Sequence, residues 1–224
     1  GTSGRRVYCA PQVYRAQQSH LYRNNRDGSF ADVTAAAGMA TQFGPALGVS
    51  PAHFNRGAWI DVYVANDREE NQLWINRQNG TFENLGLLSG TALGPFGQAK
   101  SGMGVDAGDI DNDGDEDIVV TNLTGEGHDL YVNDGTGTFV NASAVAGISH
   151  RSLPYTGFGA GWLDLDNDGW LDLLTVNGAV QTPEAPGADG ALAPLGQAKQ
   201  LFRNLGDARF EDVTAAGGPV LLRT

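Results

Sequence analysis

The chain has 224 residues, of which 41% are hydrophobic and 18% charged, a composition typical of a folded globular protein. Asp and Glu outnumber Lys and Arg by 26 to 14, and the formal net charge of -12 argues against a nucleic-acid ligand and favours cations or basic surfaces. Apolar stretches fall well short of the roughly 20 residues that span a bilayer, so we expect a soluble, not transmembrane, chain.

A hairpin motif recurs four times along the chain. Each copy starts with Leu, an aromatic residue, any residue and Asn; Phe follows six residues after the Asn, and Gly eight residues after the Phe. The first part is typical of a short strand, and the polar residues before the Phe favour a tight turn into a returning strand. The copies carry Asn24, Phe30 and Gly38; Asn76, Phe82 and Gly90; Asn133, Phe139 and Gly147; and Asn204, Phe210 and Gly218. The tail before each Gly fits either a helical turn or a crossing loop.

A second repeated segment precedes three of these hairpins. In each copy an Asp stands five residues before an Asn, with a strand-like apolar run between them, and a glycine-rich segment upstream predicts one further strand. The pairs are Asp61 and Asn66, Asp117 and Asn122, and Asp172 and Asn177. Four short strands in a recurring unit are the signature of a β-propeller blade. We therefore predict an all-β fold with blades of four antiparallel strands, about three full blades plus a partial one.

The repeats divide the chain into successive units. We expect an N-terminal extension at 1–20, a partial blade at 21–40, a blade without a metal loop at 41–93, blades with calcium loops at 94–149 and 150–218, and a tail at 219–224. The last blade carries a Pro-, Ala- and Gly-rich inserted loop at 181–196. A closed ring needs about twice this length. We therefore expect the open blade edges to be covered by a protein partner or by the remainder of a longer propeller chain. Cys9 is the single cysteine, so no intrachain disulfide is possible.

Two acidic loops stand in register with the last two blades. Asp109-x-Asp111-x-Asp113-Gly-x-x-Asp117 recurs as Asp164-x-Asp166-x-Asp168-Gly-x-x-Asp172. Alternate carboxylates around a glycine bend can converge on a hard cation, and the carbonyl of the seventh residue can complete the shell. The loops therefore predict two Ca²⁺ sites, formed by Asp109, Asp111, Asp113, Asp115 and Asp117, and by Asp164, Asp166, Asp168, Trp170 and Asp172.

Two alternatives to these calcium sites can be weighed. An EF-hand needs Glu at the twelfth position, where the two loops have Val120 and Thr175. A solvated acidic turn is the other alternative, and the recurrence of the loop in register with the repeat argues against it.

The first unit departs from the acidic pattern. Aligned on Gly57, it has Ala52, Phe54 and Arg56 where Asp would fall, and one extra residue before Asp61. We predict no calcium in this loop. We expect His53 to be a loop or packing residue rather than a ligand.

These segments resemble FG-GAP/VCBS repeats. More narrowly, LYRNNRDGSFADVTAAAGMA, DVYVAND, SGMGVDAGDIDNDGDEDIVVTN and LFRNLGDARFEDVTAAGG are together similar to the ASPIC/UnbV group, the bacterial relatives of the cartilage acidic protein. The resemblance implies a seven- or eight-bladed propeller that is secreted or periplasmic and acts in adhesion or assembly rather than in catalysis. It also implies that the acidic-loop residues named above are the metal ligands.

The leading expectation is a non-enzymatic, calcium-binding interaction module, a subunit or fragment of an extracytoplasmic assembly that is periplasmic, secreted or on the cell surface. A propeller hydrolase or lyase is one alternative, with His128 as a general base rather than a surface-loop residue. A carbohydrate-binding lectin is another, with stacking faces from Trp59, Trp74, Trp162 or Trp170. Packing between blades is the competing explanation for three of these tryptophans.

Overall fold

The computed structural model describes residues 11–180 and 195–222. Cys9 and nearly all of the predicted inserted loop lie outside these residues. Among the described residues, no helix combines the length and apolar character needed to cross a membrane. The helices are short: a 3-10 turn η1 (Pro11–Val13), α1 (Gly86–Ser89) and α2 (Ile148–Ser152).

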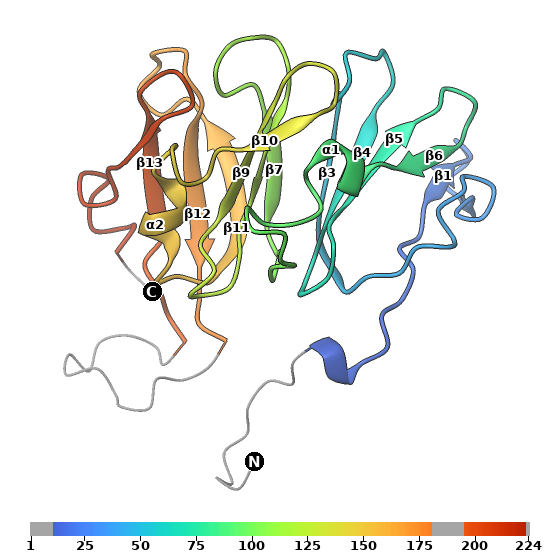
Figure 1. Ribbon diagram of the computed structural model, residues 1–224, viewed down its shortest axis with the longest axis horizontal. Coiled ribbons are helices and arrows are strands. Elements are labelled where there is room, and N and C mark those ends of the chain that lie inside the picture. The colour runs from blue at the N-terminus through green and yellow to red at the C-terminus, as the bar shows by residue number, and fades with distance from the viewer. Residues whose placement is uncertain (1–10, 181–194, 223–224) are drawn as a thin grey trace, which may run out of the picture.

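Three four-stranded antiparallel sheets, each made of consecutive strands, form the body of the molecule (Figure 1). Blade A contains β3 (Ala46–Ala52), β4 (Asp61–Asn66), β5 (Gln72–Asn76) and β6 (Phe82–Asn84). Blade B contains β7 (Val105–Gly108), β8 (Asp117–Val120), β9 (Asp129–Asn133) and β10 (Phe139–Asn141). Blade C contains β11 (Gly157–Leu163), β12 (Asp172–Asn177), β13 (Gln200–Asn204) and β14 (Phe210–Asp212). The predicted all-β blade architecture is confirmed.

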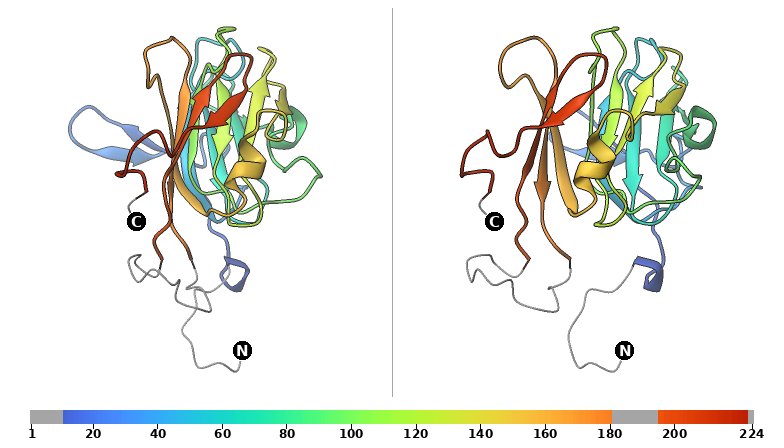
Figure 2. Two further views of the ribbon diagram at one scale, coloured as in Figure 1. Left: turned by 90° about the vertical axis from the view of Figure 1, so that its left-hand side faces the viewer. Right: turned by 60° about the vertical axis from the view of Figure 1, so that its left-hand side comes forward.

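A separate two-stranded sheet, β1 (Tyr22–Asn24) and β2 (Phe30–Asp32), is the hairpin of the partial blade. It projects from the three sheets in the left view of Figure 2. Its tail still contacts blade A, because the amide of Phe82 donates a 2.9 Å hydrogen bond to the carbonyl of Ala37. The partial blade is thus joined to the array through the outer strand of its neighbour.

The four hairpins have the register that the Asn and Phe spacing predicts. Asn24 pairs with Phe30, Asn76 with Phe82, Asn133 with Phe139, and Asn204 with Phe210. Each Asn also caps its own turn, since its Oδ1 accepts a hydrogen bond from the amide two residues later, at 2.7 to 3.1 Å. Local hydrogen bonding therefore fixes both the turn and the strand register.

The tail after each hairpin carries the repeat to the next unit. It is a short helix in blade A and turns elsewhere, and it ends at a Gly with φ between 80° and 85°. A Cβ added to Gly90 would stand 2.8 Å from the carbonyl oxygen of Phe139, and one added to Gly147 would stand 3.0 Å from that of Phe210. The Phe-to-Gly spacing thus serves contact with the following blade as well as backbone conformation.

The hydrophobic core lies between blades. One cluster joins blades A and B and includes Phe54, Tyr63, Ile118 and Tyr131. A second cluster joins blades B and C and includes Ile110, Val119, Leu173, Phe202 and Phe210. Each blade therefore buries its apolar faces against its neighbours, and the loops between the first two strands of adjacent blades are brought side by side.

Candidate metal centres

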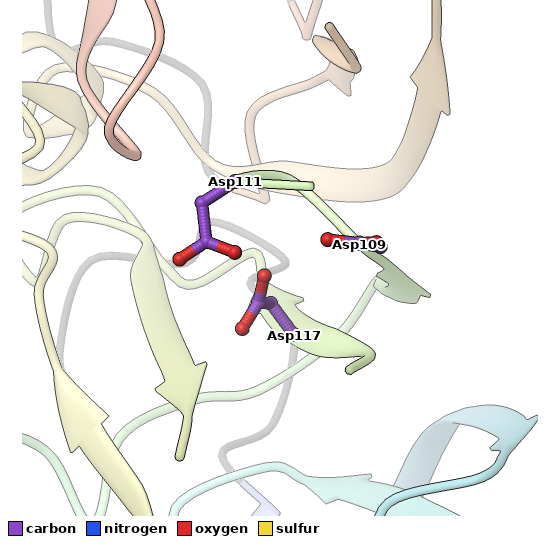
Figure 3. Close-up of side chains that lie close together, drawn as sticks. All are labelled: Asp109, Asp111 and Asp117. Atoms are coloured by element: carbon purple, nitrogen blue, oxygen red, sulfur yellow. The ribbon is translucent and has the colours of Figure 1, made fainter. Parts of the chain in front are cut away.

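The acidic loops connect the first two strands of blades B and C; we call residues 109–117 loop B and residues 164–172 loop C. In loop B, Asp109, Asp111 and Asp117 each place a ligand atom within 4.8 Å of the others. The carboxylates of Asp111 and Asp117 face one another (Figure 3). Loop C brings Asp164, Asp166 and Asp172 together in the same way. Positions one, three and nine of both loops thus form a trio of carboxylates.

Backbone amides hold each loop in this shape. The two carboxylate oxygens of Asp109 accept hydrogen bonds from the amides of Asp113 at 3.1 Å and Gly114 at 3.0 Å. The positive φ values of Asn112, 59°, and Gly114, 91°, let the chain turn back toward Asp109. Loop C repeats this geometry, with Asp164 accepting from Asp168 and Gly169, both at 3.1 Å.

The ninth Asp ties each loop to the hairpin of its blade. Asp117 accepts from the amide of Ile110 at 3.1 Å and from that of Asn133, on β9, at 2.8 Å. Asp172 accepts likewise from Leu165 at 2.9 Å and from Asn204, on β13, at 2.8 Å. Asp117 and Asp172 are 1% and 0% exposed, so the innermost carboxylate of each trio is shielded from water.

The remaining predicted ligands stand outside the trios. Asp113 and Asp168 each use Oδ1 to accept from the amide two residues later, at 3.0 and 2.9 Å, which leaves Oδ2 for a cation. The side chain of Asp115 is engaged by Arg56, and the indole of Trp170 lies near Gly206. Asp115 and Trp170 were predicted as carbonyl ligands, a role that does not depend on their side chains.

Burial of loop B makes its negative charge costly. Burial raises the pKa of Asp117 to about 7, and the charges of Asp111 and Asp113 add to the rise. The pKa of Asp111 is also raised, first by burial and then by the charges of Asp113 and Asp109. Oδ1 of Asp111 is buried without a hydrogen-bond partner. An unpartnered buried carboxylate oxygen beside two further carboxylates fits a hard cation such as Ca²⁺.

The two loops differ in exposure. Ile110, the second residue of loop B, is 0% exposed, whereas the equivalent Leu165 of loop C is 46% exposed. Blade C covers loop B, since the side-chain amide of Asn204 donates a 2.7 Å hydrogen bond to the carbonyl of Ile110. The two trios are therefore alike in geometry and unlike in surroundings.

The predicted alignment of the first loop on Gly57 is wrong. The amide of Phe54 donates to Asp61 at 3.1 Å, as that of Ile110 does to Asp117, so residues 53–61 form a nine-residue loop, loop A, with no extra residue. His53, Asn55 and Gly57 therefore occupy positions one, three and five. Nδ1 of His53 lies 3.1 Å from the carbonyl oxygen of Gly57, a bond that closes the loop. Loop A has a carboxylate at position nine alone, and the absence of calcium from this loop stays a prediction.

The sequence left two alternatives for His128, a general base or a surface-loop residue. The structure shows that His128 does not lie on the surface. Its side chain is fully buried, and its Nδ1 accepts a 3.1 Å hydrogen bond from the amide of Asn122. Burial lowers the pKa of His128 to about 3, with a smaller contribution from the charge of Lys100. A side chain enclosed in this way does not reach a substrate in solvent.

Three of the four tryptophans pack rather than stand free. Trp74 is 3% exposed, Trp162 packs on Phe210 with ring centroids 5.8 Å apart, and Trp170 is half-buried. Trp59 is 50% exposed.

One residue near the metal loops is not predicted from the sequence. The guanidinium of Arg56 donates hydrogen bonds to both carboxylate oxygens of Asp115 in loop B, from Nε at 2.9 Å and from Nη2 at 2.8 Å. Its single signal in the sequence is a basic residue within loop A, which lacks the acidic pattern.

Comparison with known proteins supports the blade assignment. A family described as FG-GAP-like repeat matches residues 54–120 and 117–175. Cartilage acidic protein 1 of Xenopus tropicalis is 25% identical over 192 residues, which cover 79% of this chain and 29% of that protein, so the chain spans less than a third of its length.

A solved structure titled as the recognition of non-reducing terminal N-acetylglucosamine by an Agrocybe aegerita lectin is 18% identical, with a TM-score of 0.47 over 88% of this chain and 45% of that one. The repeat matches run from loop A to the strand that follows loop C. Because they cover more than half of the residues, the chain belongs to the FG-GAP-like repeat family.

Proposed function

We propose that this chain is a calcium-binding interaction module of a β-propeller, that it works outside the cytoplasm, and that it is not an enzyme. The observation that carries the metal assignment is the duplicated carboxylate trio, together with the unpartnered buried oxygen of Asp111. All the side-chain ligands offered are oxygens, which suit Ca²⁺ better than a transition metal. Extracellular modules bind Ca²⁺ with dissociation constants of about 10⁻⁴ to 10⁻³ M, so such loops would fill outside the cell.

The interaction surface is the open face of blade C. Blades A and B each receive the next blade on this face through three contacts: an inner-strand Gly, a loop carbonyl and a tail Gly. In blade A, the loop carbonyl is that of Phe54, which accepts a 3.0 Å hydrogen bond from the side-chain amide of Asn133 in blade B. In blade B, the carbonyl of Ile110 accepts the equivalent bond from Asn204 in blade C. In blade C the corresponding Leu165 carbonyl has no such donor within residues 11–180 and 195–222.

The two glycine contacts point the same way. A Cβ on Gly48 would stand 2.1 Å from the Met103 carbonyl oxygen, and one on Gly104 would stand 2.7 Å from Cα of Gly159. In blade C, a Cβ added to Gly159 would lie 3.7 Å from Cβ of Val176, a residue of the same blade. A Cβ added to Gly218 would have no described atom within 4 Å. Within residues 11–180 and 195–222, blade C thus leaves unused the three contacts through which blades A and B carry a neighbour. We propose that its partner is a further blade of this kind, from the rest of a longer chain or from another protein.

Calcium is expected to raise the thermal stability of the protein. At concentrations about ten to a hundred times the dissociation constant, each filled site adds about 1.4–2.7 kcal/mol. Differential scanning calorimetry of EDTA-treated protein, with and without Ca²⁺, measures this gain. In the double variant Asp111→Asn plus Asp166→Asn we expect the gain to be lost, and we expect Mg²⁺ to reproduce little of it. Equal melting temperatures in EDTA and in Ca²⁺ would remove the metal assignment.

A bulky charge on the open face is expected to block docking and to spare the fold. Gly159→Arg adds a side chain where an added Cβ has a single neighbour, Val176. We expect the purified variant to keep the melting temperature of the wild type and to lose the higher-mass species that the wild type forms with its partner blade, as followed by native mass spectrometry of the two chains mixed. Assembly that survives Gly159→Arg would show that docking uses another face.

Carbohydrate binding is the second candidate, favoured by the half-exposed indole of Trp59. An exposed tryptophan face can stack on a sugar ring. A glycan array separates the two functions: binding that Trp59→Ala abolishes and Gly159→Arg leaves intact would favour the lectin function over blade docking.

A further inference from the structure

The fourth residues of loops A and B each bond to the loop of the next blade. Arg56, Asn112 and Asn167 hold this position with φ values of 56°, 59° and 59°. Arg56 of loop A reaches Asp115 of loop B. Nδ2 of Asn112, in loop B, donates a 3.2 Å hydrogen bond to the carbonyl of Gly169 in loop C. The repeated backbone turn thus places one side chain of loop A, and one of loop B, against the following loop.

A second set of hydrogen bonds runs in the opposite direction. Nδ2 of Asn204, on β13, donates to the carbonyl of Ile110 in loop B at 2.7 Å and to that of Leu171 in loop C at 3.1 Å. The amide of the same Asn204 donates to Asp172, the ninth residue of loop C. One residue is therefore bonded to both candidate metal loops, and the pair of loops is tied at Asn112 and again at Asn204.

Loop B is held from both sides. The guanidinium of Arg56 and the carboxylate of Asp115 lie over Gly135, where a Cβ would stand 2.4 Å from each of them. The carboxylate of Asp115 is 4% exposed, so this ion pair is shielded at its acidic end. Loop C is held from blade B, and its own position-four residue, Asn167, forms no hydrogen bond to a further loop among the described residues.

We propose that Ca²⁺ binding at loops B and C is positively coupled through Asn112 and Asn204, and that Arg56 is a positioning residue for loop B. This inference rests on the proposed calcium function. An ion that fixes one loop also fixes the carbonyl or amide that its neighbour uses, so the second ion meets a loop that is already ordered. Arg56 of blade A holds loop B in place through Asp115, as Asn112 of blade B holds loop C through the carbonyl of Gly169.

The coupling is measured by calcium titration calorimetry. Asp166→Asn leaves loop B as the working site, and Asp111→Asn leaves loop C. For each site, we compare the Ca²⁺ affinity in the wild type with the other site filled and the affinity in the variant that lacks the other site. We expect the first affinity to be higher by a factor of about five or more. The two variants must give the same factor, because thermodynamic coupling is reciprocal. A factor of one, or an inverse factor from repulsion between the ions, overturns the proposal.

Asn112→Gly tests the path of the coupling. Glycine accepts the positive φ of this position, so the change removes the side-chain bond to Gly169 without adding backbone strain. We expect the coupling factor to fall toward one. Asn167→Gly makes the matched change at the same position of loop C, where we expect the factor to be kept. Equal factors in the two variants would contradict a role for Asn112.

Arg56→Lys tests positioning apart from charge. Lysine keeps the positive charge and lacks the fork that binds both oxygens of Asp115. In the Asp166→Asn background we expect loop B to bind Ca²⁺ about two- to fivefold more weakly. Arg77→Lys is the control, because Arg77 pairs with Glu83 within the β5–β6 hairpin rather than with a residue of loop B or loop C. Unchanged affinity in Arg56→Lys would remove Arg56 from the site.

The outcomes separate this inference from the function on which it rests. If the wild type releases no heat with Ca²⁺ and gains no stability from it, the proposed function fails. If both sites bind Ca²⁺ with a coupling factor of one, the calcium function stands and the coupling fails. Terbium emission gives a second readout, since the loop C ion would lie close to Trp170, so its titration in the Asp111→Asn variant follows loop C alone.

Discussion

Lys100→Met is expected to destabilise the protein by about 3–5 kcal/mol, the usual cost of removing one partner from a buried ion pair. Nζ of Lys100 lies 2.7 Å from Oδ2 of Asp129, and the two side chains are 6% and 2% exposed. The backbone carbonyl of Lys100 accepts from the amide of Arg68, two residues after β4 of blade A, while Asp129 begins β9 in blade B. The pair therefore fastens the A-to-B connection in place, and the variant would leave a buried carboxylate without its counter-charge.

A second change should restore much of this loss. Gln72 and Gln200 occupy the place of Asp129 in blades A and C, directly before the Leu of the hairpin motif. We expect Lys100→Met plus Asp129→Gln to be clearly more stable than the sum of the single variants predicts, with a coupling energy of about 2 kcal/mol or more. Urea denaturation of the four proteins measures the cycle. Arg203→Met, which breaks an exposed 3.6 Å pair with Glu211, is the control and should cost under about 1 kcal/mol. Additive single effects would contradict a direct ion pair.

Gly104→Ala is expected to destabilise the interface between blades B and C. Its Cβ would stand 2.7 Å from Cα of Gly159 and equally close to Oγ1 of Thr121, and backbone atoms of β11 cannot rotate away as a side chain can. Separating the inner strands by the missing distance should cost about 1–3 kcal/mol. For this chain length, that corresponds to a drop of about 2–4 °C in Tm for each kcal/mol.

Gly159→Ala is the matched control for this substitution. It changes the same position of the next blade, where the added methyl group meets Cβ of Val176 at an ordinary 3.7 Å. We expect no loss, and a gain of a few tenths of a kcal/mol from the lower entropy of the unfolded chain. Thermal unfolding followed by circular dichroism compares the two. Similar losses in both variants would show that strand propensity, rather than contact between blades, sets the need for glycine.

The sequence predicted the features that are made within a single unit. The register of Asn133 with Phe139 follows from a hairpin whose turn is capped by the Asn itself, and such bonds span only two to six residues. The trio of Asp109, Asp111 and Asp117 is likewise local, because a nine-residue loop with a fixed pattern of amides folds in one way wherever it occurs. Repetition in register made these patterns visible.

Two other features do not follow from the spacing of Gly and Asp in the sequence. Alignment on Gly57 predicts one extra residue in loop A, whereas the bond from Phe54 to Asp61 within the loop shows that the ninth Asp sets the register and that the glycine is displaced by one residue. The sequence allows His128 to be a catalytic base or a surface residue, whereas the packing of its loop against Gly157 of blade C encloses it. Gly157 belongs to the next blade, so the motif of blade B alone does not reveal the burial of His128.

By itself, then, the sequence determined the hairpins, the blade strands and the carboxylate trios, since each arises from hydrogen bonds and side-chain spacing within a few residues. Only the tertiary structure decided how one blade meets the next: the ion pair of Arg56 with Asp115, that of Lys100 with Asp129, and the approach of Gly104 to Gly159. These contacts join residues tens of positions apart. In the sequence they look like ordinary turn or surface residues, because what selects them is the close packing of two sheets rather than local conformation.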